Sequence, residues 1–557
     1  MGRGLLAHPL LVVGVVAGLV ALGHAVWIWT HRQVGAIDPD EAGYLAAALR
    51  YQQALGWTQP LALPLEVAKT GTGPLVPLLS VPLLLVGPDD PRTAMLVQPL
   101  LLAFTAVAVA GIARRLAGAP AAIVAGVVVL GLPTVASATV SYWLGLGAAA
   151  GLAGAMWALV ASDRLTNRWA WAFGLGVAAM LLARTMTVGY LPAVAVAGLV
   201  VAGRRRESLV GLAQAAGVTV LVAGPWYLAQ RQAVFGYLFS YGYGDRSELF
   251  GERDLSDRLG ARLDRFDAGI GVGVWWGAAV LVVAVVSWAL LRRRPPDAVR
   301  SHLALGAVVV LGFAALMSTA NAGVWFELPV VVVLVPLVVG LGAAAPVAVR
   351  AVALVPVVVA AVLQLACTWW VIPPDGRDVP FVDAQGRVAH YEYGFEQYDP
   401  RFGPSRRDDL EEAAADWWAV STAVEDRLRA LGDPEGFVVT LSGNFQLFNA
   451  NTVQLAGQLD GWTPRTWIPD TVRPEDERAA DLTPAARTPD GGLVTDGQGR
   501  PVERVLLLAL HDQTLFTPDA EVRAFARQAR AAGWQPTASW DLPGGGEVVL
   551  LRHPDGP

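Results

Sequence analysis

Charged residues are scarce in this chain of 557 residues: they make up 16% of it, whereas 54% of the residues are hydrophobic. Soluble globular proteins carry about 25% charged residues. The composition therefore excludes an ordinary soluble protein and predicts a polytopic α-helical membrane protein that lies in the lipid bilayer. The net charge of −6 comes without a basic stripe, so we expect no binding to nucleic acid.

Two residue types are almost missing from the chain. There is one cysteine, Cys367, which excludes a disulfide within the chain and argues against a cysteine-based metal site. Lysine also occurs once, at Lys69, and all the other residues among the 41 cationic ones are arginine. Because the chain uses arginine wherever else it needs a positive charge, Lys69 is a candidate functional residue.

Long apolar runs fill the first two thirds of the chain. A membrane helix needs about 20 apolar residues, and we predict about eleven such helices. They cover 9–29, 92–113, 120–137, 143–161, 169–185, 187–203, 208–226, 271–291, 301–319, 329–348 and 351–371. Cationic loops favour the cytoplasmic side, and the arginine-containing loops all lie there if the N-terminus is cytoplasmic. We therefore expect a plasma-membrane protein with residues 30–91 and 372–557 outside.

Two of the apolar runs are ambiguous. The run 73–86 in the outer loop is short and contains three prolines, so we expect a helix that lies in the outer membrane interface rather than a span. Arg184 and Thr185 interrupt the run 169–203, which favours two short helices over one long helix.

The composition changes abruptly after Trp369 and Trp370. The stretches FVVTLSG, VERVLLLAL and EVVLLR are typical of strands, and they alternate with helical patterns, so we expect a small extracytoplasmic α/β domain over 372–557. The membrane module is then 1–371. The expected helices cover 405–431 and 519–533, and a long loop covers 465–500.

An acidic stretch follows the first apolar run, in GAIDPDEAGYLAAALRY at residues 35–51. In a helix that begins here, Asp40 and Tyr44 lie one turn apart on one face, and Glu41 lies about 100° around the helix. A carboxylate beside the bilayer can act as a general base toward a hydroxyl or an amine. Alternatively, the acids cap the helix and interact with its dipole, which remains the interpretation for Asp38.

Lys69 lies further along the same outer loop, in EVAKTGTGPLVPLL. One ammonium beside a Thr/Gly turn suits a phosphate group, because glycine lets backbone N–H groups approach it closely. The alternative is a lysine that only extends its ammonium to the membrane interface.

The order of these motifs resembles the GT-C glycosyltransferases, and within them the protein O-mannosyltransferases and the lipid A aminoarabinose transferases. The resemblance rests on the DExxY acid pair, the Lys/Gly/Pro stretch and three later segments. These are WAFGLGVAAMLLART (171–185), GPWYLAQRQAVFGYLF (224–239) and VWFELPVVVVLVP (324–336).

The resemblance implies a GT-C fold and a polyprenyl-phosphate sugar donor, with inversion at the anomeric carbon. Asp40 matches the family's proposed catalytic base and Glu41 its second acid, with Tyr44 in the wall of the site. Lys69 matches the lysine that meets the lipid-linked phosphate, and Arg184 stands where a lysine often does.

The outer loop YGYGDRSELFGERD offers two further cations, Arg246 and Arg253. The resemblance makes them candidates for contacts to the leaving phosphate, whereas a solvated loop is the favoured interpretation for either arginine alone.

Three departures from the family pattern narrow the expectations. The second outer loop, ASATVSYWLG, has no acid where metal-binding relatives carry one, so we expect no tightly bound metal and no cofactor. Gly43 stands where the aminoarabinose transferases have arginine, so the donor is not expected to be recognised in the same way. Glu327, in WFELP, is interpreted as a polar turn residue.

The C-terminal part offers only weak candidates. Asn444, Asn449, Asn451, Trp462 and Trp467 suit contacts to sugars, but turns at strand edges are the favoured interpretation for the asparagines. The histidines have no metal-ligand spacing; they are His390, His511 and His553.

These observations predict a glycosyltransferase that transfers a hexose or a pentose to an extracytoplasmic glycan, lipid or protein. Two alternatives remain open. One is a transporter or flippase of lipid-linked glycans, although the chain shows no internal repeat and most of its acids lie outside the expected spans. The other is an inactive GT-C-like scaffold that binds glycans.

Overall fold

The computed structural model describes residues 8–32, 39–55, 61–270 and 296–369, with short gaps, and in the C-terminal part 378–382, 388–392, 407–467, 482–510 and 519–556, again with short gaps. Contacts divide the chain into two compact units. The first, here called the helical unit, contains Met1–Trp29, Leu55–Ser80 and Met95–Pro400. The second, here called the mixed unit, contains Thr30–Ala54, Val81–Ala94 and Arg401–Pro557.

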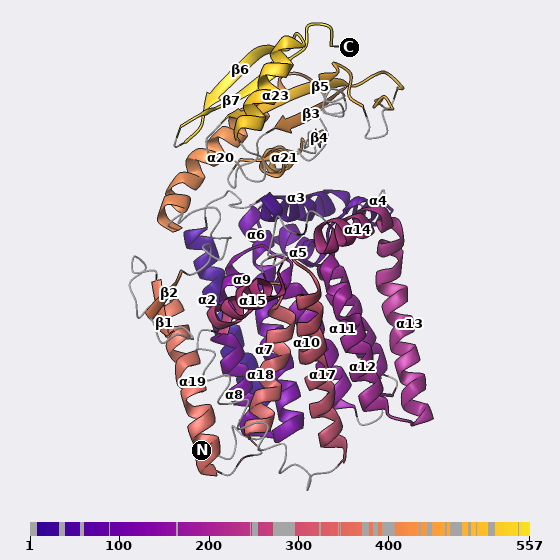
Figure 1. Cartoon of the computed structure of the whole chain (residues 1–557), viewed down its shortest axis with the longest axis vertical. Helices are drawn as coiled ribbons and strands as arrows, with labels where there is room; N and C mark the ends of the chain where they lie inside the picture. The colour runs from indigo at the N-terminus through magenta and orange to yellow at the C-terminus, as the bar shows by residue number, and fades with distance from the viewer. Residues whose placement is uncertain are drawn as a thin grey trace. The chain divides into compact units, whose positions relative to one another are not determined.

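The helical unit is a bundle whose long helices run side by side (Figure 1). The N-terminal helices are α2 (Pro9–His31), α4 (Ala62–Lys69), α5 (Leu75–Val86), α7 (Val97–Ala117), α8 (Ala119–Leu130), α9 (Pro133–Val140), α10 (Gly145–Ala161) and α11 (Arg168–Ala183). Then follow η1 (Thr185–Tyr190), α12 (Leu191–Ala202), α13 (Arg206–Ala229), α14 (Arg231–Tyr237), η2 (Leu238–Tyr243), α15 (Leu255–Ile270), α17 (Pro296–Ser318), α18 (Leu328–Gly342), α19 (Val347–Trp369) and the hairpin of β1 (Asp378–Val382) and β2 (Val388–Glu392). The second half of α5 and nearly all of α6 (Pro91–Met95) belong to the mixed unit.

Five of the described helices are long and apolar enough to cross a membrane: Pro9–Thr30, Pro91–Ala117, Thr185–Ala202, Arg206–Ala229 and Val299–Ser318. A sixth span is possible by length and composition if α8 and α9, which meet at 58°, count as one bent segment. Further apolar helices, among them α5, α10, α11 and α18, are shorter. The chain is thus a multi-pass membrane protein, but the expected number of eleven spans is not confirmed, and the expected span 271–291 lies outside the described residues.

Small residues bring the bundle helices close together. A Cβ atom on Gly151 of α10 would lie 2.4 Å from the Met180 nitrogen of α11, and one on Gly176 of α11 would lie 2.6 Å from the Ala155 nitrogen of α10. Helices in lipid gain little from the hydrophobic effect against each other, so close backbone packing at small residues is their main attraction. The Ala/Gly-rich sequences of α10 and α11 therefore specify this contact.

The ambiguous run 169–203 forms two helices, α11 and α12, as favoured from the sequence. The break lies at Arg184, which has extended backbone between α11 and η1. The run 73–86 also contains the expected helix, α5, and its place in the membrane interface stays a prediction.

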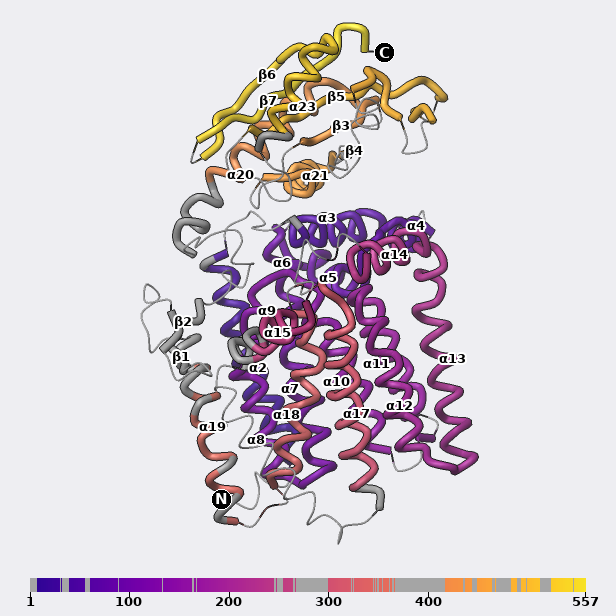
Figure 2. The backbone as a smooth tube through the Cα atoms, viewed as in Figure 1, coloured from indigo at the N-terminus to yellow at the C-terminus, as the bar shows by residue number. Residues whose placement is uncertain are grey.

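The mixed unit is built around one sheet of five strands in the order β4-β3-β5-β7-β6. Its elements are α3 (Pro39–Ala54), α20 (Arg407–Arg429), β3 (Phe437–Ser442), α21 (Ala450–Leu459), β4 (Arg465–Trp467), β5 (Glu503–Leu510), α23 (Asp519–Ala531), β6 (Gln535–Asp541) and β7 (Glu547–Arg552). Strand β3 is parallel to β4 and β5, whereas β7 is antiparallel to β5 and β6. Helix α23 packs across β5 and β7 (Figure 2) through Val522 and Phe525, in a core cluster that also contains Trp534.

The small α/β domain and its three quoted strands are confirmed, as are the helices at α20 and α23. Several elements were not predicted, among them α21 and β6. Helix α21 has only ten residues and begins at an Asn-rich turn, and β6 has the sequence QPTASWD, whose side chains are mostly exposed. The predicted loop 465–500 begins with the short strand β4, and much of the rest of it lies outside the described residues. The predicted domain division at residue 371 remains a prediction.

Candidate functional site

The acidic stretch forms the start of α3, which begins at Pro39 with Asp40 and Glu41 in its first turn. Proline suits the first helical position and acids there interact favourably with the helix dipole, so the sequence specifies this helix start. The Asp40 side chain is exposed and Tyr44, one turn later, is half-buried. Asp38 lies outside the described residues.

Glu41 points inward and forms a buried ion pair. The Arg32 Nη2 atom donates a hydrogen bond to Glu41 Oε2 at 2.5 Å, and the two side chains are only 2% and 1% exposed. Removing one partner of a buried pair typically costs about 3–5 kcal/mol, because the other charge is left uncompensated. This pair lies within the mixed unit and ties the first turn of α3 to Arg32, so it supports a positioning role for Glu41, while a catalytic role remains a prediction.

Helix α3 packs against α21 within the mixed unit (Figure 1). A Cβ atom on Gly43 would lie 3.1 Å from Asn451 Nδ2, and Gln53 Nε2 donates to the Gln458 carbonyl at 3.2 Å. The preceding Asn449 caps α21 by accepting hydrogen bonds from the backbone N–H groups of Asn451 and Thr452. Asn449 therefore stabilises the start of α21. Asn451 lies beside Gly43 of α3, three residues after Asp40.

Lys69 lies in the last turn of α4, in the helical unit. Its ammonium contacts Glu66 Oε1 at 2.6 Å, yet its side chain is 70% exposed. Surface ion pairs contribute about 0–1 kcal/mol. The pair with Glu66 is therefore weak enough to be exchanged for a pair with a phosphate group.

The end of α4 is held by the segment with the Pro-Trp-Tyr sequence at the end of α13. Trp226 Nε1 donates to the Thr70 carbonyl at 3.1 Å, and the Gln230 side chain donates to the Ala68 carbonyl. These bonds satisfy carbonyl groups at a helix C-terminus. They fix the backbone on both sides of Lys69 and join two of the motifs that carry the family resemblance.

The glycine turn after Lys69 approaches the end of α11. A Cβ atom on Gly73 would lie 2.1 Å from the Ala183 carbonyl oxygen, so only glycine fits there. The next residue is Arg184, whose guanidinium lies over the Phe326 ring at 4.0 Å and 5.8 Å from the centroid of the Trp143 ring. The structure thus brings together the Lys69 turn and the segment that carries Arg184. Arg246 and Arg253 lie outside the described residues.

An aromatic turn precedes α18 and surrounds this arginine. Trp325 is 1% exposed and packs edge-to-face on Trp143 with the ring centroids 5.4 Å apart. Its φ of +55° is unusual for a bulky residue and costs about 1–3 kcal/mol. The Tyr190 hydroxyl donates to the Phe326 carbonyl at 2.5 Å. Such strained conformations are found mainly at functional sites.

Glu327 is the last residue of this turn and is only 4% exposed. It occupies the N-cap position of α18 without a side-chain cap hydrogen bond. Its Oε2 atom is buried with no hydrogen-bond partner among the described residues. The nearby charged groups that act electrostatically on Tyr190 are Glu327, Arg262 and Arg184.

The interpretation of Glu327 as an ordinary polar turn residue misses this burial. The signal was present in the sequence, because Glu327 stands between Phe326 and an apolar helix that begins with Leu-Pro. A turn facing water seldom carries aromatic residues and leucine on both sides of its acid.

The segment between α9 and α10 contributes neutral groups. The Tyr142 hydroxyl lies 2.7 Å from Ser80 Oγ, and Ser141 donates to the Ser137 carbonyl at 3.1 Å.

Among the described residues, three acids of the mixed unit lie close enough together to hold a cation: Glu425, Asp426 and Asp460. Arg429 already pairs with Glu425 at 3.1 Å and with Asp460 at 3.3 Å.

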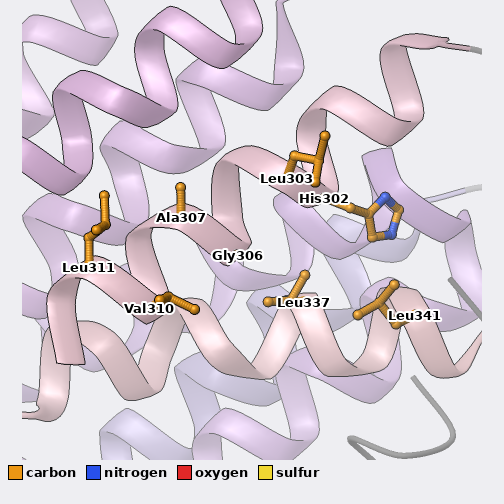
Figure 3. Close-up of a pocket in the computed structure, with 8 residues that line it drawn as sticks. All are labelled: His302, Leu303, Gly306, Ala307, Val310, Leu311, Leu337 and Leu341. Atoms are coloured by element: carbon orange, nitrogen blue, oxygen red, sulfur yellow. The ribbon is translucent and has the colours of Figure 1, made fainter. Parts of the chain in front are cut away.

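A groove of about 350 Å³ lies between α17 and α18 (Figure 3). Leu303 and Val310 line it from one helix and Leu337 and Leu341 from the other, and His302 is its one ionisable residue. It lies toward the start of α17 and the end of α18, whereas Glu327 precedes the start of α18. The groove offers little for sugar or phosphate chemistry and is separate from the turn at Glu327.

No family model and no curated protein matches the sequence. Solved structures do match. The structure of ArnT from Cupriavidus metallidurans bound to undecaprenyl phosphate has a TM-score of 0.54 at 15% identity, over 98% of this chain and 98% of that one. Its apo structure has a TM-score of 0.54 at 15% identity, over 96% and 97%.

A third match is the oligosaccharyltransferase of Archaeoglobus fulgidus in complex with Zn and sulfate. Its TM-score is 0.50 at 12% identity, over 98% of this chain and 74% of that one. The three matches cover 96–98% of this chain. This chain therefore has the GT-C fold, that of membrane glycosyltransferases such as ArnT and the archaeal oligosaccharyltransferase.

Proposed function

We propose that the protein is a membrane glycosyltransferase that moves a sugar from a polyprenyl-phosphate donor to an acceptor outside the cytoplasm. One observation carries the proposal: the fold matches ArnT bound to undecaprenyl phosphate over nearly the full length of both chains. The acceptor is a cell-envelope glycan, lipid or protein, and the sugar is a hexose or a pentose.

In the proposed reaction the acceptor hydroxyl attacks the anomeric carbon with inversion. A bond forms between the acceptor oxygen and the anomeric carbon, and the bond from that carbon to the phosphate oxygen breaks. The phosphate leaves with the electron pair, and the hydroxyl proton passes to the Asp40 carboxylate. The exposure of Asp40 at the first turn of α3 supports this role, because the acceptor must reach the base from solvent.

Lys69 and Arg184 are proposed to hold the donor phosphate. The adjoining backbone at Gly73 and Ala183 supports this pairing, as does the weak competition from Glu66. Fixed cations near a leaving phosphate stabilise the charge that develops in the transition state. With Arg246 and Arg253 added from the outer loop, the phosphate would meet cations from several segments.

The protein is proposed to work with its N-terminus in the cytoplasm and α3 outside, and without a tightly bound metal. The neutral side chains of Ser141 and Tyr142 support metal independence, because the second outer loop then has no carboxylate to hold a cation. A chelator is accordingly expected to leave the transfer rate unchanged.

The test uses the purified full chain in nanodiscs with a panel of undecaprenyl-phosphoryl sugars, including mannose and arabinose. The measurement is the release of free undecaprenyl phosphate. We expect Asp40→Asn to slow release about 10²- to 10⁴-fold, the range that general bases contribute. The matched control is Glu207→Gln, which also removes an acid from a first helical turn, that of α13.

Two results would contradict the proposal at different levels. If the wild type releases undecaprenyl phosphate from no donor but moves lipid-linked glycan across vesicle membranes, it is a transporter. If release occurs and Asp40→Asn does not slow it, the protein is a transferase with another base.

A further inference from the structure

We propose that the turn at Trp325 and Glu327, together with Trp143, is a binding subsite for sugar hydroxyl groups beside Arg184. The inference rests on the proposed function and adds to it a specific place where sugar is recognised. None of these three side chains was among the candidate sugar contacts in the sequence.

The first support is a pair of buried polar atoms without protein partners. Neither Trp325 Nε1 nor Glu327 Oε2 has a hydrogen-bond partner among the described residues, although both residues are buried. Buried polar groups are almost always paired, and a buried carboxylate without a partner is especially unfavourable. One donor and one acceptor left unpaired two residues apart indicate a ligand that supplies the complementary groups.

The second support is that no ordinary structural role accounts for Glu327. Its side chain makes no cap hydrogen bond to α18, although the residue stands at the N-cap position. No salt bridge of Glu327 occurs among the described residues. An acid in a membrane protein with a buried carboxylate oxygen that has no partner among the described residues is by default a functional residue.

The chemistry of the group fits a sugar. A carboxylate accepts hydrogen bonds from hydroxyl groups with both oxygens, and an indole donates one. The Trp143 and Trp325 rings, 5.4 Å apart and edge-to-face, add apolar surface for the C–H faces of a pyranose or furanose. Sites with a few fixed polar groups among aromatic side chains are typical of small-molecule pockets.

The position of Arg184 connects this subsite with the phosphate. Its guanidinium lies over Phe326, between Trp325 and Glu327 in the sequence. A Cβ atom on Gly145 would lie 3.4 Å from Arg184 Nη1 and 2.9 Å from Trp325 Cβ, so the arginine and the turn meet at one point of α10. In a sugar phosphate the hydroxyl groups and the phosphate are neighbours, as are Arg184 and the turn that carries Glu327 here.

The test compares two ligands with the full-length protein in nanodiscs: sugar-free undecaprenyl phosphate and the undecaprenyl-phosphoryl sugar that the wild type turns over. Glu327→Gln keeps the shape but removes the charge, and Trp325→Phe keeps a ring but removes the N–H group. Glu425→Gln is the matched control, since Glu425 is also buried with an unpartnered Oε2 but lies in α20 of the mixed unit.

If the subsite holds the donor sugar, Glu327→Gln weakens binding of the sugar-bearing lipid about 10- to 100-fold, the range for hydrogen bonds to a charged group. Binding of sugar-free undecaprenyl phosphate stays unchanged, and Trp325→Phe acts in the same direction. If the subsite holds the acceptor sugar, both lipids bind normally and the acceptor KM rises by a similar factor. Glu425→Gln changes none of these values.

A series of deoxy-sugar donors or acceptors identifies the contact. Removing the hydroxyl that meets Glu327 weakens the wild type but has little further effect in Glu327→Gln, because the two losses concern one interaction. Additive losses at every hydroxyl position would overturn the subsite.

Two other results would also overturn it. One is a Glu327→Gln variant with unchanged affinities and KM values. The other is an equal loss for the sugar-bearing and the sugar-free lipid, which would indicate a structural role. A wild type that turns over no donor at all would instead overturn the proposed function, and the subsite with it.

Discussion

The acid pair Asp40 and Glu41 and the single acid Glu327 were detected in different ways, the pair from its sequence motif and Glu327 from its surroundings in the structure. The pair Asp40 and Glu41 stands in a motif that is visible in the sequence, and the structure places it at the start of α3 with one side chain exposed and the other ion-paired to Arg32. Glu327 has a weak motif, and the structure buries its Oε2 atom without a hydrogen-bond partner in the described part of the chain. A motif therefore indicates where an acid lies in the chain, whereas its surroundings indicate what the acid can do.

The comparison also separates the two acids within the motif. Asp40 and Glu41 are neighbours in sequence, but a helix turns them about 100° apart, which is enough to expose one and bury the other. Four predictions test these differences, in order of decreasing effect.

The largest effect is expected from breaking the buried ion pair. Glu41→Ala removes the buried carboxylate that pairs with Arg32, so the free energy of unfolding should fall by about 3–5 kcal/mol. Replacing both partners, as Arg32→Met with Glu41→Leu, should cost much less. Thermal unfolding followed by intrinsic fluorescence measures both. Equal losses in the single and the double variant would show that the pair is not the cause.

The second prediction concerns the cation of the aromatic turn. Arg184→Ala should weaken binding of undecaprenyl phosphate about 10- to 100-fold, because one charge-assisted contact is lost. Arg184→Lys should be intermediate, since lysine keeps the charge but cannot stack flat on Phe326. Titration of the lipid into nanodiscs measures both, and Arg350→Ala on α19 is the control. Normal affinity in Arg184→Ala would remove Arg184 from the phosphate site.

The third prediction concerns the contact of α3 with α21. Alanine is better than glycine in a helix interior by about 1 kcal/mol, but a methyl group on Gly43 would press on Asn451. Gly43→Ala alone should therefore give less than the full gain, and Gly43→Ala with Asn451→Ala should recover it. A double-mutant cycle of unfolding midpoints should give a coupling of about 0.5–1 kcal/mol; no coupling would mean that the two helices do not touch there.

The smallest effect is expected from Glu425. Burial raises the pKa of its carboxyl group, with Asp460 and Asp426 acting in the same direction and Arg429 opposing them. The folded state therefore holds this proton more tightly than the unfolded state, so stability is greatest below the unfolded pKa and falls as pH rises through the folded pKa. Glu425→Gln should raise the unfolding midpoint at pH 8 but not at pH 4. A gain of equal size at both values would exclude titration as the cause.

Much of the fold followed from the sequence, because long apolar runs and alternating strand patterns carry strong signals. The break at Arg184 and the strands around FVVTLSG were predicted correctly. Helix α21 was missed because it is short and depends on the Asn449 cap, which is also typical of turns. Asp40 and Glu41 lie on α3, Lys69 lies on α4, and Arg184 follows α11 directly. No sequence pattern predicted that the residues after Lys69 would touch Ala183. That contact depends on Gly73, whose missing side chain has no periodic signature.

The single lysine of the chain also provides a chemical probe. Lys69 is 70% exposed and weakly paired, so apart from the terminal amino group an amine-selective acylating reagent has one side chain to modify. Its modification rate can be followed by mass spectrometry in the unmodified wild-type sequence. A polyprenyl phosphate bound at Lys69 would protect it, and this protection would report occupancy without any turnover.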